Sequence, residues 1–137
     1  MLREQLEPCP WEKIAMSQYP ESLDHMLAAW NERDPERIRA HLDQALTDDV
    51  EFCDPQHHVT GVDAFEAMVR EFRKNLPDAV CQRTSGCDSH HHLHRYEWTV
   101  SVGEDVLVPG FDVTAVDDTG KVCRVDGFFG PIPAPEL

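Results

Sequence analysis

The amino-acid sequence predicts an α+β domain in which helices come first and a run of antiparallel strands follows. In the first half of the chain, apolar residues recur every three or four positions, which is the spacing of one buried helix face. In the second half they alternate with polar residues, which is typical of strands with one buried face. No internal repeat or linker divides the chain, so we expect a single domain over residues 1–137 with the order α-α-β-α-β-β-β-β.

The first two predicted helices follow each other closely. From Glu21 the apolar residues recur at i, i+3, i+4 and i+7, namely at Leu23, Met26, Leu27 and Trp30. Asp34-Pro35-Glu36 then predicts a new helix start, because aspartate caps free N–H groups and proline fits the first helical position. The buried face of this second helix is expected to hold Ile38, Leu42, Ala45 and Leu46.

A short strand and a third helix come next. The alternation over Val50–Cys53 stops at Asp54-Pro55, because proline has no N–H to give to a β-ladder. Asp54 is therefore expected at the end of a strand. After a loop over residues 56–60, Gly61 opens a helix that closes near Asn75, with a face of Val62, Phe65, Val69 and Phe72.

The remainder of the chain changes to the period of strands. Four strands are predicted, with turns at glycines between them: Val80–Cys87, His90–Val102, Val106–Val116 and Val122–Phe129. Residues 1–18 are expected to form a lead-in segment, with a helix starting near Trp11, and residues 131–137 an extended tail. A curved sheet wrapped on helices leaves a hollow, which is a usual place for a small ligand.

Composition narrows the class of partner. Asp and Glu outnumber Lys and Arg by 26 to 12, and the formal net charge of −14 repels nucleic acid and anionic membranes. The N-terminus does not resemble a secretory signal, and no apolar run is long enough to cross a membrane. Five widely spaced cysteines without a CxxC pair fit reduced thiols, so we expect a cytoplasmic protein.

Four segments taken in order resemble the nuclear transport factor 2-like superfamily, in its ketosteroid isomerase and SnoaL-like polyketide cyclase branch. They are AAWNERDPE (28–36), TDDVEFCDP (47–55), GVDAFEAMVREF (61–72) and PGFDVTAVDDTGKVCRVDGFFG (109–130), within a resemblance from Leu23 to Gly130. The resemblance implies a cone-shaped barrel of three helices packed on a curved, mostly antiparallel sheet. It also implies a small-molecule ligand, a homodimer formed through the outer face of the sheet, and chemistry without a cofactor.

Two aspartates match the catalytic positions of ketosteroid isomerases. The resemblance implies that Asp54 is the base that moves the proton, and that Asp112 donates a hydrogen bond to the developing oxyanion. Strand alternation places Asp112 on one face with Val108, Gly110, Thr114 and Val116. Apolar surroundings would favour the neutral form of this carboxyl group, as ketosteroid isomerase itself illustrates.

One position departs from the family pattern. The tyrosine of the first helix, which is the other oxyanion donor of the family, falls on Met26, whose thioether cannot donate a hydrogen bond. The candidates to replace this donor are His57, His58, His92, His94 and Tyr96. Together with Met26, the aromatic side chains of Trp30, Trp98 and Phe128 are expected to bind an apolar substrate.

The run His90-His91-His92-Leu93-His94 suggests a different chemistry. If it is one strand, His90, His92 and His94 share a face and could hold a metal, and His90, His92 and Glu97 have the spacing of a cupin metal site. The second cupin motif lacks its histidine, and solvated histidines at a strand or turn are the plainer interpretation. We therefore assign no metal ligands.

Three hypotheses about function remain. The first is an isomerase-like or cyclase-like enzyme that uses aspartate acid-base chemistry on a small apolar carbonyl compound. The second is a non-catalytic ligand-binding domain, and the third is a metal protein built on the histidine run.

Overall fold

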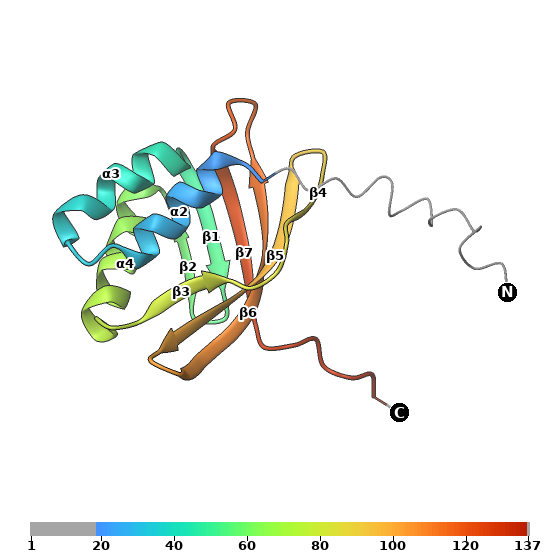
Figure 1. Cartoon of the computed structure of the whole chain (residues 1–137). Coiled ribbons are helices and arrows are strands. Elements are labelled where there is room, and N and C mark those ends of the chain that lie inside the picture. Colours follow the sequence, from blue (N-terminus) through green and yellow to red (C-terminus); the bar gives the residue numbers. More distant parts are fainter. Residues whose placement is uncertain (1–18, 137) are drawn as a thin grey trace, which may run out of the picture.

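The computed structural model describes residues 19–136, in which three helices pack on a curved, mostly antiparallel sheet (Figure 1). The predicted lead-in over residues 1–18, with its helix near Trp11, lies outside the described residues. The helices are α2 (Glu21–Asn31), α3 (Pro35–Ala45) and α4 (Val62–Asn75). The strands are β1 (Leu46–Asp54), β2 (His57–Thr60), β3 (Val80–Arg83), β4 (Asp88–His90), β5 (Leu93–Val102), β6 (Asp105–Val116) and β7 (Val122–Phe129). The predicted α+β class is confirmed.

The sheet is open, so the expected barrel does not close. Its strand order is β2-β1-β7-β6-β5-β3, with β4 paired to β5 beyond the end of β3. The pairing of β1 with β7 is parallel and every other pairing is antiparallel. The three helices lie on one side of this sheet (Figure 1).

The helix boundaries follow from the local signals in the sequence. Asp34 caps α3 by accepting a hydrogen bond from the Glu36 N–H at 3.0 Å, and Pro35 occupies the first helical position. Gly61 precedes α4 with φ of 93°, a left-handed value that residues with a Cβ rarely adopt.

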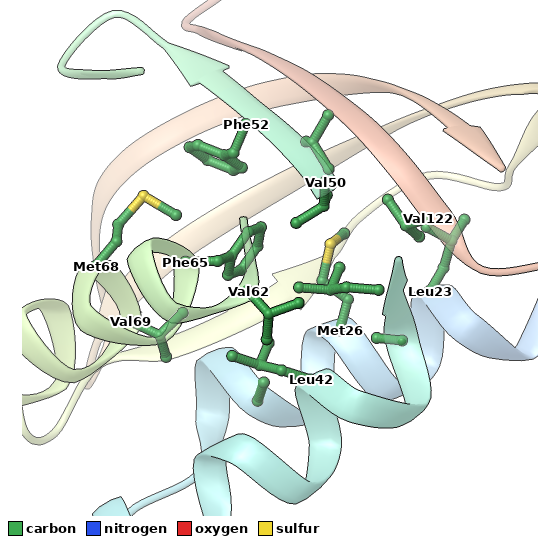
Figure 2. Packing of buried hydrophobic residues seen from close by; sticks show 14 of the residues in the cluster. Leu23, Met26, Leu42, Val50, Phe52, Val62, Phe65, Met68, Val69 and Val122 are labelled. Carbon is green, nitrogen blue, oxygen red and sulfur yellow. The ribbon is translucent and has the colours of Figure 1, made fainter. Parts of the chain in front are cut away.

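The core lies between the helices and the sheet (Figure 2). Leu42 from α3, Phe65 and Val69 from α4, and Val50 from β1 and Val122 from β7 are all fully buried. The Phe65 ring packs edge to face on Phe52, with ring centroids 5.3 Å apart. This apolar layer fixes the helices on the sheet.

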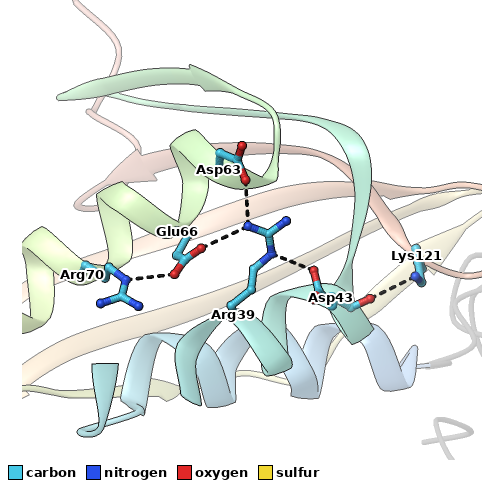
Figure 3. Close-up of polar contacts among 6 residues, drawn as sticks. All are labelled: Arg39, Asp43, Asp63, Glu66, Arg70 and Lys121. Carbon is cyan, nitrogen blue, oxygen red and sulfur yellow. Dashed lines mark hydrogen bonds and ion pairs between the residues drawn. The ribbon is translucent and has the colours of Figure 1, made fainter. Parts of the chain in front are cut away.

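The outer surface of the helices carries a network of paired charges (Figure 3). The Arg39 guanidinium on α3 contacts Asp43 at 2.8 Å, Asp63 at 2.7 Å and Glu66 at 3.1 Å. Glu66 also accepts from Arg70 at 2.9 Å. These contacts link α3 to α4 at the surface.

Two segments differ from the sequence prediction. The predicted loop after Pro55 contains strand β2, an exposed edge strand without the apolar alternation that identifies a buried one. The predicted strand over His90–Val102 is interrupted, because His91 and His92 form the turn of the β4–β5 hairpin and His91 has φ of 52°. Within residues 19–136, none of the helices has the length and apolar character needed to cross a membrane.

Candidate functional site

A cavity of about 350 Å³ lies between the helices and the sheet. Leu23, Met26, Leu27 and Trp30 of α2 form part of its apolar wall. The polar side chains come mainly from the strands and include Asp54 of β1, Asp112 of β6 and Tyr96 of β5. The volume lies in the range that suits a small organic ligand.

Strand register places the polar groups in a row across the sheet. Asp112 on β6 is directly opposite Gly127 on β7, and on its other side opposite Tyr96 on β5. Cys53 on β1 pairs with Asp126 on β7, so Asp54 lies beside Gly127. The row therefore runs from Asp54 through Gly127 and Asp112 to Tyr96.

Gly127 leaves room for the two carboxyl groups to share the cavity. A Cβ at this position would lie 2.9 Å from Asp112 Oδ1 and 3.4 Å from Asp54 Cβ. Contacts below 3.0 Å are essentially never seen for real Cβ atoms, so any side chain here would push Asp112 aside. The glycine is required by close approach and not by its backbone conformation.

The Asp54 carboxylate is anchored by one of its two oxygens. Oδ1 accepts hydrogen bonds from the backbone N–H of Gln56 and of His57, both at 2.8 Å, and from His57 Nδ1 at 3.1 Å. His57 lies opposite Asp54 in the β1–β2 pairing, which sets this contact. Oδ2 accepts no hydrogen bond from the described residues, so it is the oxygen left to accept a proton from a ligand.

Asp112 is held differently, by two side-chain donors. Its Oδ1 accepts from the Trp98 indole N–H at 2.8 Å and its Oδ2 from the Tyr96 hydroxyl at 3.3 Å. Burial, together with a smaller effect of the nearby Asp54 charge, raises the pKa of Asp112 to about 6 against the lowering effects of the Trp98 and Tyr96 hydrogen bonds. Burial and the neighbouring Asp112 raise the pKa of Tyr96 well above 10.0, so its hydroxyl stays neutral and can donate.

A second glycine allows Trp98 to reach Asp112. Trp98 on β5 pairs with Gly110 on β6, and a Cβ at Gly110 would overlap the Trp98 ring. The indole therefore lies across the glycine, toward the residue two positions along on the same strand face. Because Gly110 has no side chain, the Trp98 indole can reach Asp112 and form the hydrogen bond.

The structure brings together most of the residues predicted at the site. Asp54, Asp112, Tyr96 and Trp98 line the cavity, as do Met26 and Trp30. Strand β6 has the predicted register, since Asp112 and Val108 both face the cavity. The roles assigned to these residues stay predictions.

Three residues predicted to bind substrate lie away from the cavity, namely His58, Phe128 and His94. His58 pairs with Cys53 on the opposite face of β2 from His57, and its side chain is 66% exposed near Glu51. Phe128 points outward and is half exposed, because Gly127 and Phe129 take the inward positions of β7.

His94 is buried, but it lies beyond the cavity. The β4 hairpin covers it, and its Nδ1 lies 2.7 Å from Ser89 Oγ. Burial and the nearby His92 lower the pKa of His94, which favours the neutral ring.

The prediction that His90, His92 and His94 share a strand face is wrong. His92 lies in the hairpin turn, and His90 and His92 are exposed while His94 is buried. Among residues 19–136 no group of three His, Cys, Asp or Glu side chains is arranged to hold a metal ion.

Sequence reasoning missed several residues of the cavity. Arg83 and Cys81 face it from β3, and Tyr19 from the segment before α2. Alternation anchored on the buried Val125 would have assigned Gly127 and Phe129 to the inner face. For Tyr19 the sequence contains no such signal, because it lies outside the helices and strands.

Comparisons with known proteins agree with this architecture. Residues 23–125 match the SnoaL-like domain family. A structure from Agrobacterium tumefaciens str. C58, called a "putative isomerase" of the SnoaL-like family, is 28% identical with a TM-score of 0.75, over 81% of this chain and 96% of that one. A search of curated proteins found no match.

Two further structures share the fold at lower identity. A "putative ketosteroid isomerase" from Kribbella flavida DSM 17836 is 21% identical with a TM-score of 0.63, over 86% of this chain and 82% of that one. A "putative polyketide cyclase" from Sinorhizobium meliloti is 14% identical with a TM-score of 0.64, over 80% and 94%. With the family match over most of its length and the same helix-then-sheet architecture, this chain belongs to the SnoaL-like domain family.

Proposed function

We propose that the protein is an enzyme that moves a proton on a small, largely apolar carbonyl compound, as in isomerisation or aldol-type cyclisation. The observation that carries this proposal is that two carboxyl groups with different environments, those of Asp54 and Asp112, face one cavity. Acid-base catalysis needs one group that accepts a proton and another that stabilises the resulting charge.

The Asp54 carboxylate would act as the base. Its Oδ1 is fixed by Gln56 and His57, which leaves Oδ2 without a hydrogen bond from the described residues. Oδ2 would take a proton from the carbon next to the carbonyl group, and the electron pair of that C–H bond would move to the carbonyl oxygen. Return of the proton from Asp54 to another carbon completes an isomerisation without a cofactor.

Asp112 and Tyr96 would stabilise the enolate oxygen. In its protonated form Asp112 can donate to the oxyanion, and its raised pKa makes that form accessible near neutral pH. The Tyr96 hydroxyl has one proton, which it gives to Asp112 Oδ2 without a ligand; it would turn this proton to the enolate oxygen and so supply the donor that Met26 cannot. The name of the Agrobacterium protein supports an isomerase, and that of the Sinorhizobium protein a cyclase.

The proposal is tested by α-hydrogen exchange. A panel of small cyclic ketones that includes 2-tetralone is incubated in D₂O with the protein, and deuterium incorporation is followed by NMR. Asp54→Asn should slow the protein-catalysed exchange about 100- to 10,000-fold, which is the range for loss of a general base. Asp49→Asn, on an exposed position of the same strand, is the control and should leave the rate unchanged. Equal exchange by the wild type and Asp54→Asn would contradict the proposal.

A second candidate is a ligand-binding domain without catalysis. Both Asp112 oxygens already accept hydrogen bonds within the protein, and the first-helix donor of the family is absent at Met26. This candidate predicts that ketones bind in the cavity without exchange above the buffer rate. Measuring binding by quenching of tryptophan fluorescence beside the exchange assay separates the two functions.

We also propose a cytosolic homodimer that forms through the outer face of the sheet. Phe111 of β6 and Phe128 of β7 stack there with ring centroids 4.9 Å apart, and Phe128 is half exposed. The described cysteines Cys53, Cys81, Cys87 and Cys123 are free thiols, which suits a reducing compartment. Light scattering should give twice the chain mass, and Phe128→Asp should convert the dimer to monomer; a monomeric wild type would contradict the dimer.

A further inference from the structure

Arg83 brings a permanent positive charge to the cavity. It lies on β3 directly opposite Trp98 of β5, with its side chain on the cavity face. Its guanidinium carbon is 3.6 Å from the centroid of the Tyr19 ring, a cation–π contact that fixes the plane of the group. The other arginines of residues 19–136 do not line the cavity.

One nitrogen of this guanidinium is unpaired. Arg83 Nη1 is buried and meets no hydrogen-bond acceptor among the described residues, nor does Arg83 form an ion pair with any of them. Arg73, which is more deeply buried, donates to the backbone oxygens of Trp30, Pro77 and Ala79, although its Nε is unpaired as well. Arg83 lines the cavity without a carboxylate paired to it, so the N–H groups of this planar guanidinium suit an anionic group of a ligand.

Arg83 and Asp54 lie on strands at opposite sides of the cavity, so a ligand that reacts at Asp54 could reach Arg83 with its other end. β3 and β1 are four strand spacings apart in the sheet order, which corresponds to about 19 Å along the sheet and less across its concave face. Trp98 and Val100 of β5 and Val108 of β6 line the wall on this side of the cavity. Asp112 does not compete for Arg83, since its oxygens are taken by Tyr96 and Trp98.

We infer that Arg83 binds a carboxylate of the substrate, so that the ligand is a carbonyl compound with an apolar body and one carboxylate end. The guanidinium would hold the carboxylate against the Tyr19 ring while the apolar body crosses Trp98. This inference rests on the proposed function for the Asp54 end of the ligand. The carboxylate contact itself can be tested by binding alone.

The test compares two probes of nearly the same shape, the anionic 2-naphthoate and the neutral 2-naphthamide. Their dissociation constants are measured by calorimetry at mildly alkaline pH for the wild type and for Arg83→Met. The wild type should bind 2-naphthoate at least about tenfold more tightly than 2-naphthamide, since a charge-assisted hydrogen bond is stronger than a neutral one. Arg83→Met should remove that preference while 2-naphthamide still binds.

Matched variants identify the cause. Arg95→Met, which removes an equal charge from the exposed Arg95–Asp88 pair on the outer face of the neighbouring strand, should keep the preference. Asp54→Asn should keep it too, so that a failure of the base assignment is distinguishable from a failure at Arg83. The inference is overturned if the wild type binds both probes equally, if it binds no 2-naphthoate at millimolar concentration, or if Arg83→Met retains the preference. The wild-type comparison needs no variant to fold.

Discussion

The helix surface and the cavity treat polar groups in opposite ways. On the helix surface, Arg39 is surrounded by three carboxylates and Glu66 bonds two arginines (Figure 3). In the cavity, Asp54 Oδ2 and Arg83 Nη1 have no partner among the described residues. Charges at the surface are paired within the protein, whereas Asp54 and Arg83, which line the cavity, each keep an atom without a partner among the described residues.

This difference indicates which part of the chain serves stability and which part serves function. A side chain packed on all sides contributes to folding, and its removal leaves a hole. A buried polar atom without a hydrogen-bond partner destabilises the fold. Such an atom is expected where a ligand supplies the missing partner. Substitutions in the two regions should therefore affect different measurements.

The largest effect on stability is expected in the apolar core. Phe65→Ala should lower the free energy of unfolding by about 3–5 kcal/mol, because Phe65 is fully buried against Phe52 and Trp30 and its loss leaves a cavity. Urea unfolding measures this change. The control is Ile132→Ala in the exposed tail, which should have little effect; similar losses in both variants would break the comparison.

Tyr96→Phe should affect the rate instead. Losing the hydroxyl that bonds Asp112 should lower the ketone exchange rate about 100- to 1000-fold, as expected for one oxyanion donor. The same variant should raise the Asp112 pKa, because the hydrogen bond from Tyr96 lowers it. An unchanged exchange rate in a variant that is folded by circular dichroism would rule out Tyr96 as the donor.

Relative to the wild type, Asp112→Asn should become more stable as the pH rises. The Asp112 pKa is about 6 in the fold and 3.8 ordinarily, so the folded state holds this proton more tightly than the unfolded chain. The wild type therefore loses stability as the pH rises from the ordinary value through the folded one, and asparagine does not titrate. The variant should gain about 3 kcal/mol relative to the wild type between about pH 4 and about pH 8, at 1.36 kcal/mol per pH unit. A constant difference across this range would show that Asp112 is not buried in neutral form.

The smallest effect is expected at the most conspicuous ion pairs. Arg39→Met removes contacts to three carboxylates, but the network is exposed to water, where such pairs contribute little. Its urea midpoint should stay close to that of the wild type. A loss as large as that of Phe65→Ala would mean that the surface network stabilises the fold as much as the core does.

The sequence predicted the helices well because their signals are local. The spacing of Leu23, Met26 and Trp30 and the Asp34-Pro35 cap depend on neighbours in the chain. Edge strand β2 could not be found in this way, because an exposed strand has no apolar alternation. The turn at His91 has a left-handed backbone without glycine, so no turn residue marked it.

Site residues could be predicted where the sequence shows which face of the strand points inward, and they were missed where it does not. Asp112 was assigned to the correct face because β6 alternates over twelve residues. Phe128 was assigned to the wrong face, since two adjacent phenylalanines give no parity of their own. Arg83 was missed because β3 has only four residues and its charge suggested solvent, whereas the fold turns it toward Tyr19.

The most direct test of the central claim, that Asp54 and Asp112 share one cavity in which burial and the Asp54 charge raise the Asp112 pKa, is a ¹³C NMR titration of the Asp112 carboxyl group. In the wild type the Asp112 pKa should be near 6, and in Asp54→Asn it should fall, because the Asp54 charge is one of the causes that raise it. An Asp112 pKa near 3.8 in the wild type, or a raised value that Asp54→Asn leaves unchanged, would contradict the account.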